Sequence, residues 1–232
     1  MLVPLTRAKL EQIVPAIATG PQYRYAWGRP RDWLQKVLVS VVGLVALLLL
    51  SLLFEGFAQG LDLFFSIVVG LYWLWGPVYW ASVKNSRYRR YKYGGFWRGR
   101  ILDVFISDDL VEEVESFNQD GELVIVENRE RRINLEIGDE SGFRTRLQAP
   151  LKRVHKLIAP GQVAEGLVFS NQPDLSQIDR FSDLYIPSQD LWVGEYPILQ
   201  RDVFVDVSND LRPRRARPRS RPPARRVSRR SR

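Results

Sequence analysis

The clearest feature of the hydrophobic pattern is a pair of uncharged stretches at residues 37–54 and 63–83. At 1.5 Å per residue the first would form a helix roughly 27 Å long, close to the roughly 30 Å hydrocarbon core of a bilayer. The second is long enough to cross with some tilt, and Gly76-Pro77 is expected to kink it. The short link between them, residues 55–62, allows only an antiparallel hairpin. The pattern favours a transmembrane helical hairpin over residues 34–83, and not buried helices of a soluble protein.

Basic residues flank this hairpin on both sides, whereas its loop holds two acids and no base. Because Lys and Arg accumulate on the cytoplasmic side of spans, both termini are expected on the cytoplasmic or stromal face. Trp33, Tyr79 and Trp80 are candidate interfacial anchors. The rings at residues 72–75 would lie near mid-bilayer, as anchors or as a helix-packing face. The spans contain no ionisable residue, which argues against a carrier or proton relay built by this chain alone.

A juxtamembrane segment rich in basic and aromatic residues follows at residues 84–100. It contains the helix-breaking pair Gly94-Gly95. Its position directly after a span favours binding to anionic lipid headgroups. Stacking on nucleic acid and contact with a protein partner are the alternatives. The candidate binding residues are Lys84, Arg87, Arg89, Arg90, Lys92, Arg98 and Arg100.

From residue 101 the pattern changes to short runs of alternating polarity, typical of β-strands. The runs cover residues 101–107, 110–117, 122–127, 132–137 and 143–148, with turns expected at 118–121 and 139–142. Residues 151–170 predict two more strands around a Pro160-Gly161 turn, and residues 199–211 a closing helix. The sequence therefore predicts an α+β membrane protein whose residues 101–211 form a small, mostly antiparallel β domain, either a barrel or a meander.

The N-terminal segment, residues 1–33, carries a weaker helical pattern. Leu10, Ile13, Val14 and Ile17 share one face after a possible cap at Thr6, and Pro15 interrupts the pattern. This amphipathic face would dock on lipid or a partner, or else cover the protein's own domain.

Charge divides the chain more sharply than its net +8 suggests. Residues 1–100 carry a net +9, residues 101–211 a net −12, and residues 212–232 a net +11 with no acid. The last segment cannot bury a core and is expected to be disordered. It would bind anionic lipid, RNA, a partner or its own acidic domain, or would simply be a solvated terminus. Its candidate contacts are Arg214, Arg215, Arg217, Arg225 and Arg226.

Signatures of catalysis are missing from the sequence. There is no cysteine, only one histidine, His155, and no phosphate-binding, dinucleotide-binding, zinc-protease or nucleophile-elbow motif. The acid pairs Asp108-Asp109 and Glu112-Glu113 would point to opposite faces of a strand, so neither pair converges as a site requires. His155, between basic neighbours, is expected at a surface or interface. We therefore expect no enzyme, no cofactor and no metal.

Three stretches carry a resemblance to a known family: VPLTRAKLEQIVPAIATGPQYRYAWG, YRRYKYGGFWRGR and YIPSQDLWVGEYPILQRDVFVDVS. Together with the hairpin, over about residues 3–208, they resemble an uncharacterised two-span membrane protein family of cyanobacteria and plastids. Some members carry a permease label, which two uncharged spans do not support. The resemblance implies a location in the thylakoid or plasma membrane of an oxygenic phototroph. It identifies no active-site residue in this chain.

These features predict a non-catalytic, membrane-anchored interaction protein that assists assembly or stability of a membrane complex, such as a photosynthetic one. The expected partners are a bilayer with anionic lipid, subunits of that complex and a second copy of the chain, whereas nucleic acid would bind only through the tail. The alternative is an accessory or oligomeric subunit of a transport system. Gly43, Gly70 and Gly76 permit the close helix approach that either function could use.

Overall fold

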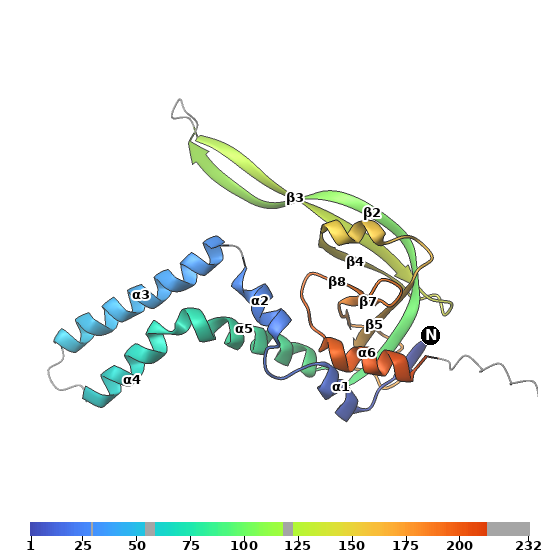
Figure 1. The fold of residues 1–232 in the computed structure, drawn as a ribbon, viewed down its shortest axis with the longest axis horizontal. Helices are drawn as coiled ribbons and strands as arrows, with labels where there is room; N and C mark the ends of the chain where they lie inside the picture. Colours follow the sequence, from blue (N-terminus) through green and yellow to red (C-terminus); the bar gives the residue numbers. More distant parts are fainter. Residues whose placement is uncertain (29, 54–58, 118–122, 213–232) are drawn as a thin grey trace, which may run out of the picture.

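A helical limb and a sheet domain make up this computed structural model, which describes residues 1–28, 30–53, 59–117 and 123–212 (Figure 1). The limb contains α2 (Gly20–Trp27), α3 (Pro30–Leu53), α4 (Gln59–Gly70) and α5 (Tyr72–Arg89). The domain contains α1 (Arg7–Ile13), α6 (Arg201–Asp210), a short 3₁₀ helix η1 (Arg153–Leu157) and the strands β1 (Leu2–Pro4), β2 (Tyr93–Phe117), β3 (Leu123–Gly138), β4 (Arg144–Pro150), β5 (Val163–Ser170), β6 (Arg180–Phe181), β7 (Leu184–Ile186) and β8 (Leu191–Val193). The predicted α+β class is confirmed.

The strands form one open antiparallel sheet in the order β4-β3-β2-β5-β7-β8, with β1 paired to β2 and β6 paired to β5. The sheet does not close, so the barrel alternative is wrong. Strands β2, β3 and β4 are consecutive neighbours, as a meander requires. In Figure 1 the far ends of β2 and β3 leave the domain as a two-stranded ribbon.

Strand β2 is longer than the sequence pattern indicates. We expected separate strands at 101–107 and 110–117, but pairing with β3 continues through Asp108 and Asp109. Asp108 lies opposite Arg131, and their side chains form an ion pair of 3.6 Å, so the acidic pair does not interrupt the ladder. A register shift between Leu110 and Glu112 marks a bulge, just beyond the break that was expected at 108–109. Strand β3 likewise joins the two runs expected at 122–127 and 132–137.

The expected turns have mixed outcomes. The turn at 139–142 is confirmed: Asp139 N donates to Phe143 O, and Gly142 adopts a φ of 90°. The turn at 118–121 lies outside the described residues. Residues 151–170 form η1 and a single strand, not two strands, although Gly161 does turn the chain with a φ of 86°. The closing helix α6 is confirmed.

Two hydrophobic clusters pack on opposite faces of the sheet, because successive strand residues point to opposite sides. On one face Phe96 packs with residues of α1 and α6, among them Ile13 and Phe204. On the other face its neighbour Trp97 packs with Leu135 and with side chains of the connecting loops. The two helices therefore cover one face of the domain, as Figure 1 shows.

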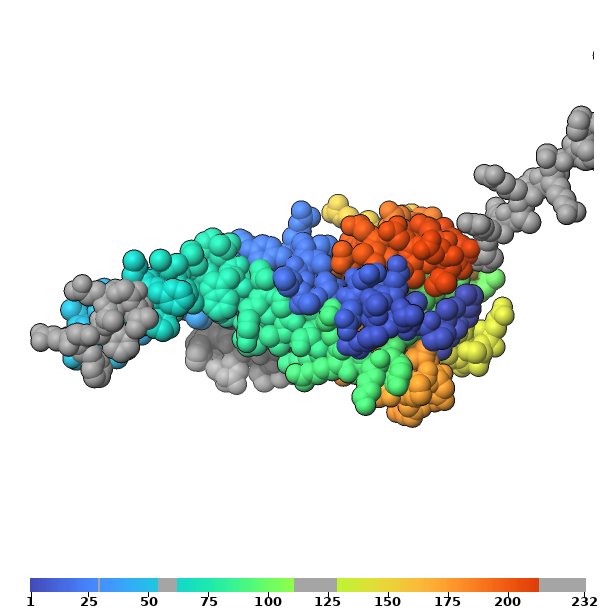
Figure 2. Space-filling model, turned by 90° about the horizontal axis from the view of Figure 1, so that it is seen from below, coloured from blue at the N-terminus to red at the C-terminus, as the bar shows by residue number. Residues whose placement is uncertain are grey.

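The first part of the N-terminal segment, residues 1–14, belongs to this domain. Thr6 caps α1 by accepting a hydrogen bond from Lys9 N, and Leu10 and Ile13 are buried against the sheet and α6. Strand β1 pairs with β2, and Ile13 O accepts from Gln200 N at 2.8 Å. Of the two alternatives for this segment, the helix covers the protein's own domain. The surface view in Figure 2 shows α1 and α6 side by side.

The second uncharged stretch does not form one helix. It is split at Leu71 into α4 and α5, whose axes differ by 71°. A kink was expected at Gly76-Pro77. This pair lies inside α5, where Pro77 is buried and the helix continues past it. Helix α4 packs tightly on α3, since a side chain on Gly43 would collide with Val69.

Candidate functional site

The limb exposes an unusually apolar surface. Helix α3 has 24 residues, and leucines such as Leu48, Leu52 and Leu53 are between 61% and 77% exposed. By length and composition α3 could cross a membrane on its own, whereas α4 and α5 meet that test only as one bent pair. Contiguous exposed apolar surface of this kind marks contact with lipid or protein.

The break between α4 and α5 is closed by three hydrogen bonds from side chains. Ser40 Oγ accepts from Trp73 N at 3.2 Å, Trp75 Nε1 donates to Val68 O at 2.8 Å, and Tyr23 Oη donates to Leu74 O at 3.3 Å. A helix break within a bilayer is tolerated where neighbouring side chains satisfy the freed backbone groups. Side chains therefore bond several of the backbone groups at the bend.

The position of this bend along α3 can be described relative to Lys36. Its ammonium group donates to the carbonyl oxygens of Ala26 and Trp27 at the end of α2. Ser40, which holds the bend, lies one helical turn further along α3. The bend is thus one turn beyond the last basic residue that precedes the apolar part of α3.

The three expected anchors differ in their surroundings. Tyr79 and Trp80, on α5, are 53% and 58% exposed, and the Trp80 indole donates to the Tyr72 hydroxyl at 3.2 Å. Trp33, on α3, is only partly exposed. The two exposed anchors therefore lie on α5, about two turns beyond the bend.

The seven candidate bases of residues 84–100 fall into two groups. Three point to internal partners: Lys84 lies over the Tyr196 ring, Arg89 donates to Glu11 O and Val14 O, and Arg98 pairs with Glu165 at 2.8 Å. The exposed group comprises Arg87, Arg90, Lys92 and Arg100. Residues 84–100 are not one element either, because α5 ends at Arg89 and β2 begins at Tyr93. The tail candidates, Arg214, Arg215, Arg217, Arg225 and Arg226, lie outside the described residues.

His155 is buried within the domain, whereas a position at a surface or interface was expected. It lies in η1, where its Nδ1 accepts a hydrogen bond from Lys152 N at 3.2 Å. Burial, aided by the nearby charge of Lys152, lowers the pKa of His155. The neutral ring thus stabilises the start of η1, a structural role.

The acidic pair of β2 forms no converging site. Asp108 pairs with Arg131, while Asp109 accepts from Gln148. The side chains of Glu112 and Glu113 lie outside the described part. Within that part, no group of three or more His, Asp or Glu residues is arranged to hold a metal ion.

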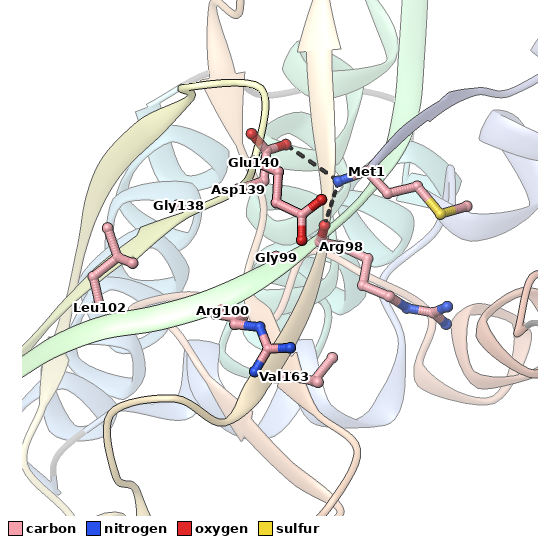
Figure 3. Close-up of a pocket in the computed structure, with 9 residues that line it drawn as sticks. All are labelled: Met1, Arg98, Gly99, Arg100, Leu102, Gly138, Asp139, Glu140 and Val163. Carbon is pink, nitrogen blue, oxygen red and sulfur yellow. Dashed lines mark hydrogen bonds and ion pairs between the residues drawn. The ribbon is translucent and has the colours of Figure 1, made fainter.

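A shallow cavity of about 390 Å³ surrounds the N-terminal amine (Figure 3). Met1 N donates to Arg98 O at 2.7 Å and to Asp139 Oδ2 at 3.4 Å, and Trp97 Nε1 donates to the same carboxylate oxygen. Burial alone would raise the pKa of Asp139, but hydrogen bonds from Ser141 and the charge of Met1 outweigh it and lower the pKa. The cavity wall thus ties β1 to the β3–β4 turn.

Sequence reasoning missed a buried carboxyl group, that of Asp183, which is 4% exposed. Its Oδ1 accepts from Ile198 N and Leu199 N, each at 3.2 Å. Burial raises the pKa of Asp183 to about 7 despite these bonds. The only local signal was its place just before the apolar run 184–186, which also suits a solvated turn.

Comparison with known proteins places the chain in a family. A family profile matches residues 3–217, which is most of its length. The chain belongs to DUF8619, a family of unknown function. The DUF8619 match starts in β1 and continues beyond α6, so it includes both the limb and the sheet domain. No curated protein and no solved structure matches the chain.

Proposed function

We propose that this DUF8619 protein is a non-catalytic, membrane-anchored interaction protein that assists assembly or stability of a membrane complex. The observation that supports this most is the limb itself, whose apolar side chains are exposed and whose helix break is internally hydrogen-bonded. A sheet domain attached directly to that limb would be held at the membrane surface.

In this proposal α3 and α4 enter the bilayer as a hairpin, and α5 turns to run along its cytoplasmic or stromal surface. The 71° bend directs α5 well away from the axis of α4. Tyr79 and Trp80 then occupy the interface, where amphipathic rings are favoured. The rings at 72–75 no longer need a place at mid-bilayer. This geometry replaces the continuous second span that the sequence pattern suggested.

Helix length constrains how the hairpin sits. Helix α4 has 12 residues, about 18 Å at 1.5 Å per residue, against a hydrocarbon core of roughly 30 Å. A short hydrophobic segment is accommodated by local thinning of the bilayer. Because α5 turns away along the surface, this thinning would have to be local to the hairpin.

Two exposed surfaces are available to a client, that is, to the membrane complex that the protein would assist. One is the outer face of the limb, which would contact transmembrane helices of a complex. The other is the β2–β3 ribbon, which extends from the domain and exposes Ile106 and Leu110. The resemblance to a family of phototrophs supports a photosynthetic complex in a thylakoid or plasma membrane as the client.

The chain has no cysteine, so single introduced cysteines can test the topology. In sealed membrane vesicles of known orientation, Gly60→Cys should react with an impermeant maleimide from the side opposite to Asn209→Cys. Reaction of both on the same side, or protection of Gly60→Cys from both sides, would contradict a hairpin that crosses the bilayer.

The interaction role can be tested by purification from gently solubilised native membranes. Ile106→Asp should reduce the recovery of co-purifying complex subunits while the protein remains in the membrane. Ile17→Asp is the matched control, since Ile17 is also exposed and apolar but lies outside the ribbon. Ion flux through bilayers reconstituted with the pure protein, without any co-purifying complex, would favour the transport subunit instead.

A further inference from the structure

A cavity of about 510 Å³ lies where the short helix η1 meets the base of the β2–β3 ribbon. Val104 and Ile106 of β2 and Ile133 of β3 line it on one side, and residues of the segment 151–158 line it on the other. Val104 and Ile133 pack with the hydrophobic cluster of Trp97, and Ile106 shares their face of the sheet. Because Ile106 is 59% exposed, the apolar floor of the cavity extends from the core of the domain to its surface.

The charged side chains that line this cavity are all basic. They are Lys152, Arg153 and Lys156, which are exposed and form no ion pair with any described residue. Residues 141–164 contain no acid at all. Asp108, two residues beyond Ile106 on β2, is already paired with Arg131. Three cations therefore lie beside an apolar floor without a described counter-charge.

A buried hydrogen-bond donor also faces the cavity. His155 lines it and is only 3% exposed. Because Nδ1 of this ring accepts from Lys152 N, the neutral imidazole carries its proton on Nε2. Nε2 bonds to no described residue, and it is not among the fully enclosed polar atoms, so a molecule in the cavity can reach it. Buried polar groups almost always have partners, so an acceptor from outside the domain is expected here.

Apolar surface continues beyond the cavity on both sides. Val154 and Leu157 of η1 are 48% and 58% exposed, and Leu110, further along the ribbon, is 48% exposed. A small anion would satisfy the donors but would leave this surface in water. A segment of a protein would cover it, since protein interfaces combine an apolar centre with a charged or polar rim.

We propose that this cavity binds an acidic peptide segment that also carries large apolar side chains. The inference rests on the proposed function and names the chemistry of the partner in the complex. Carboxylate oxygens only accept hydrogen bonds, so they match the Nε2 donor of His155 and the Lys and Arg side chains, which only donate. The apolar side chains of the segment would pack on Ile106 and Ile133. A basic segment would instead meet three like charges.

An unbiased selection tests this chemistry without knowledge of the partner. The full chain in phosphatidylcholine nanodiscs would be used to select from a phage-displayed library of random peptides, after removal of phage that bind empty nanodiscs. The selected peptides should be enriched in Asp and Glu and in large apolar residues relative to the starting library. The tightest of them should bind at least about tenfold more tightly than its counterpart with Asn and Gln in place of the acids, and salt should weaken it. No enrichment in acidic residues, or equal affinity of the amide counterpart, would overturn the proposal.

Variants of the basic residues locate the site. The triple variant Lys152→Gln/Arg153→Gln/Lys156→Gln should weaken the selected peptide at least about tenfold, because it removes three charge contacts. Lys92→Gln is the matched control, since Lys92 is an exposed base that does not line the cavity, and it should bind as the wild type does. Equal affinities for the triple variant and the control would refute the site.

Two further variants test the buried donor and the apolar floor. His155→Asn retains an oxygen that can accept from Lys152 N but lacks the Nε2 donor, so it should weaken the peptide. Ile106→Asp should weaken it as well, even if His155→Asn folds poorly, whereas the exposed Ile17→Asp should not. Binding that is unchanged by Ile106→Asp would contradict an apolar contact at the cavity.

The outcomes separate this inference from the proposed function. If Ile106→Asp loses the co-purifying subunits but no acidic peptide is selected, the interaction role stands and the acidic chemistry of the partner is wrong. If acidic peptides bind the cavity but subunits co-purify equally with Ile106→Asp, the cavity stands and the ribbon is not where the complex binds. A membrane occupant is tested with a polarity-sensitive fluorophore on Val154→Cys, in a chain that has no other cysteine. A blue shift of its emission on replacing phosphatidylcholine by phosphatidylglycerol, without peptide, would place η1 on anionic lipid and overturn a protein partner.

Discussion

Replacing Arg98 by methionine should destabilise the sheet domain far more than the same change at Arg100. The Arg98 guanidinium donates from Nε to Glu165 Oε1 at 2.9 Å, and its Nη2 lies 2.8 Å from the same oxygen and donates to Ser208 O. It thereby joins β2, β5 and α6. Glu165 is 1% exposed, so Arg98→Met would leave an uncompensated carboxylate in the core.

Removing one partner of a buried ion pair costs roughly 3–5 kcal/mol. For a cooperative unit of 150–250 residues, 1 kcal/mol corresponds to about 2–4 °C, so the melting temperature should fall by about 6–20 °C. Near-UV circular dichroism of the full chain in detergent would record the transition, because the rings of Phe96 and Trp97 lie in the two cores.

The matched control is Arg100→Met, which removes the same charge two residues along the same strand. Arg100 is exposed, so the cost should stay within about 0.5 kcal/mol. The double variant Arg98→Met/Glu165→Met should recover most of the loss, since replacing a whole buried pair by apolar groups is often neutral. Equal melting temperatures for Arg98→Met and Arg100→Met would refute the assignment of Arg98 to the core.

Three further expectations concern other parts of the fold. Ile13→Ala should cost about 2–5 kcal/mol because Ile13 is fully buried against α6, whereas Ile17→Ala should be nearly neutral in the same thermal melt. Ser40→Ala should lower the free energy of unfolding by about 1–2 kcal/mol, because it leaves Trp73 N without its partner at the bend. Ser40→Thr keeps a hydroxyl group and should retain this stability. The raised pKa of Asp183 means that the folded state binds a proton more tightly than the unfolded state, so its contribution to stability should fall as the pH rises from about 4 to about 7. Melting temperatures across this range should fall less in Asp183→Asn than in the wild type, and parallel curves would contradict the buried, raised-pKa carboxyl group.

The sequence predicted features that depend on local composition. Length and apolarity alone identify α3, and alternation of polar and apolar residues identifies the strand-rich region. The position of the bend at Leu71 was not predictable in this way, because the obvious breaker is Pro77. Ser40 and Tyr23, distant in sequence, form hydrogen bonds with the backbone beside the bend, and no local pattern reveals such contacts.

Features that depend on partners across the fold were missed for the same physical reason. Asp108 looks like a strand end until Arg131 is known to lie opposite it. Arg98 looks like one more surface base of a basic segment, but the pairing of β2 with β5 places it beside Glu165. Asp183 resembles a turn residue, and only the folded chain brings the amides of Ile198 and Leu199 to it.

The attachment of β1 and α1 to the sheet domain imposes an order on synthesis and assembly. The partners of these first residues are β2, which follows the helical limb, and α6, which lies near residue 200. While a ribosome is making the limb, α1 has not yet met the surface that will bury Ile13. The limb is therefore complete before the domain can close around its own N-terminal segment. A truncation that removes α6 should accordingly leave α1 open to proteolysis while the helices of the limb still form.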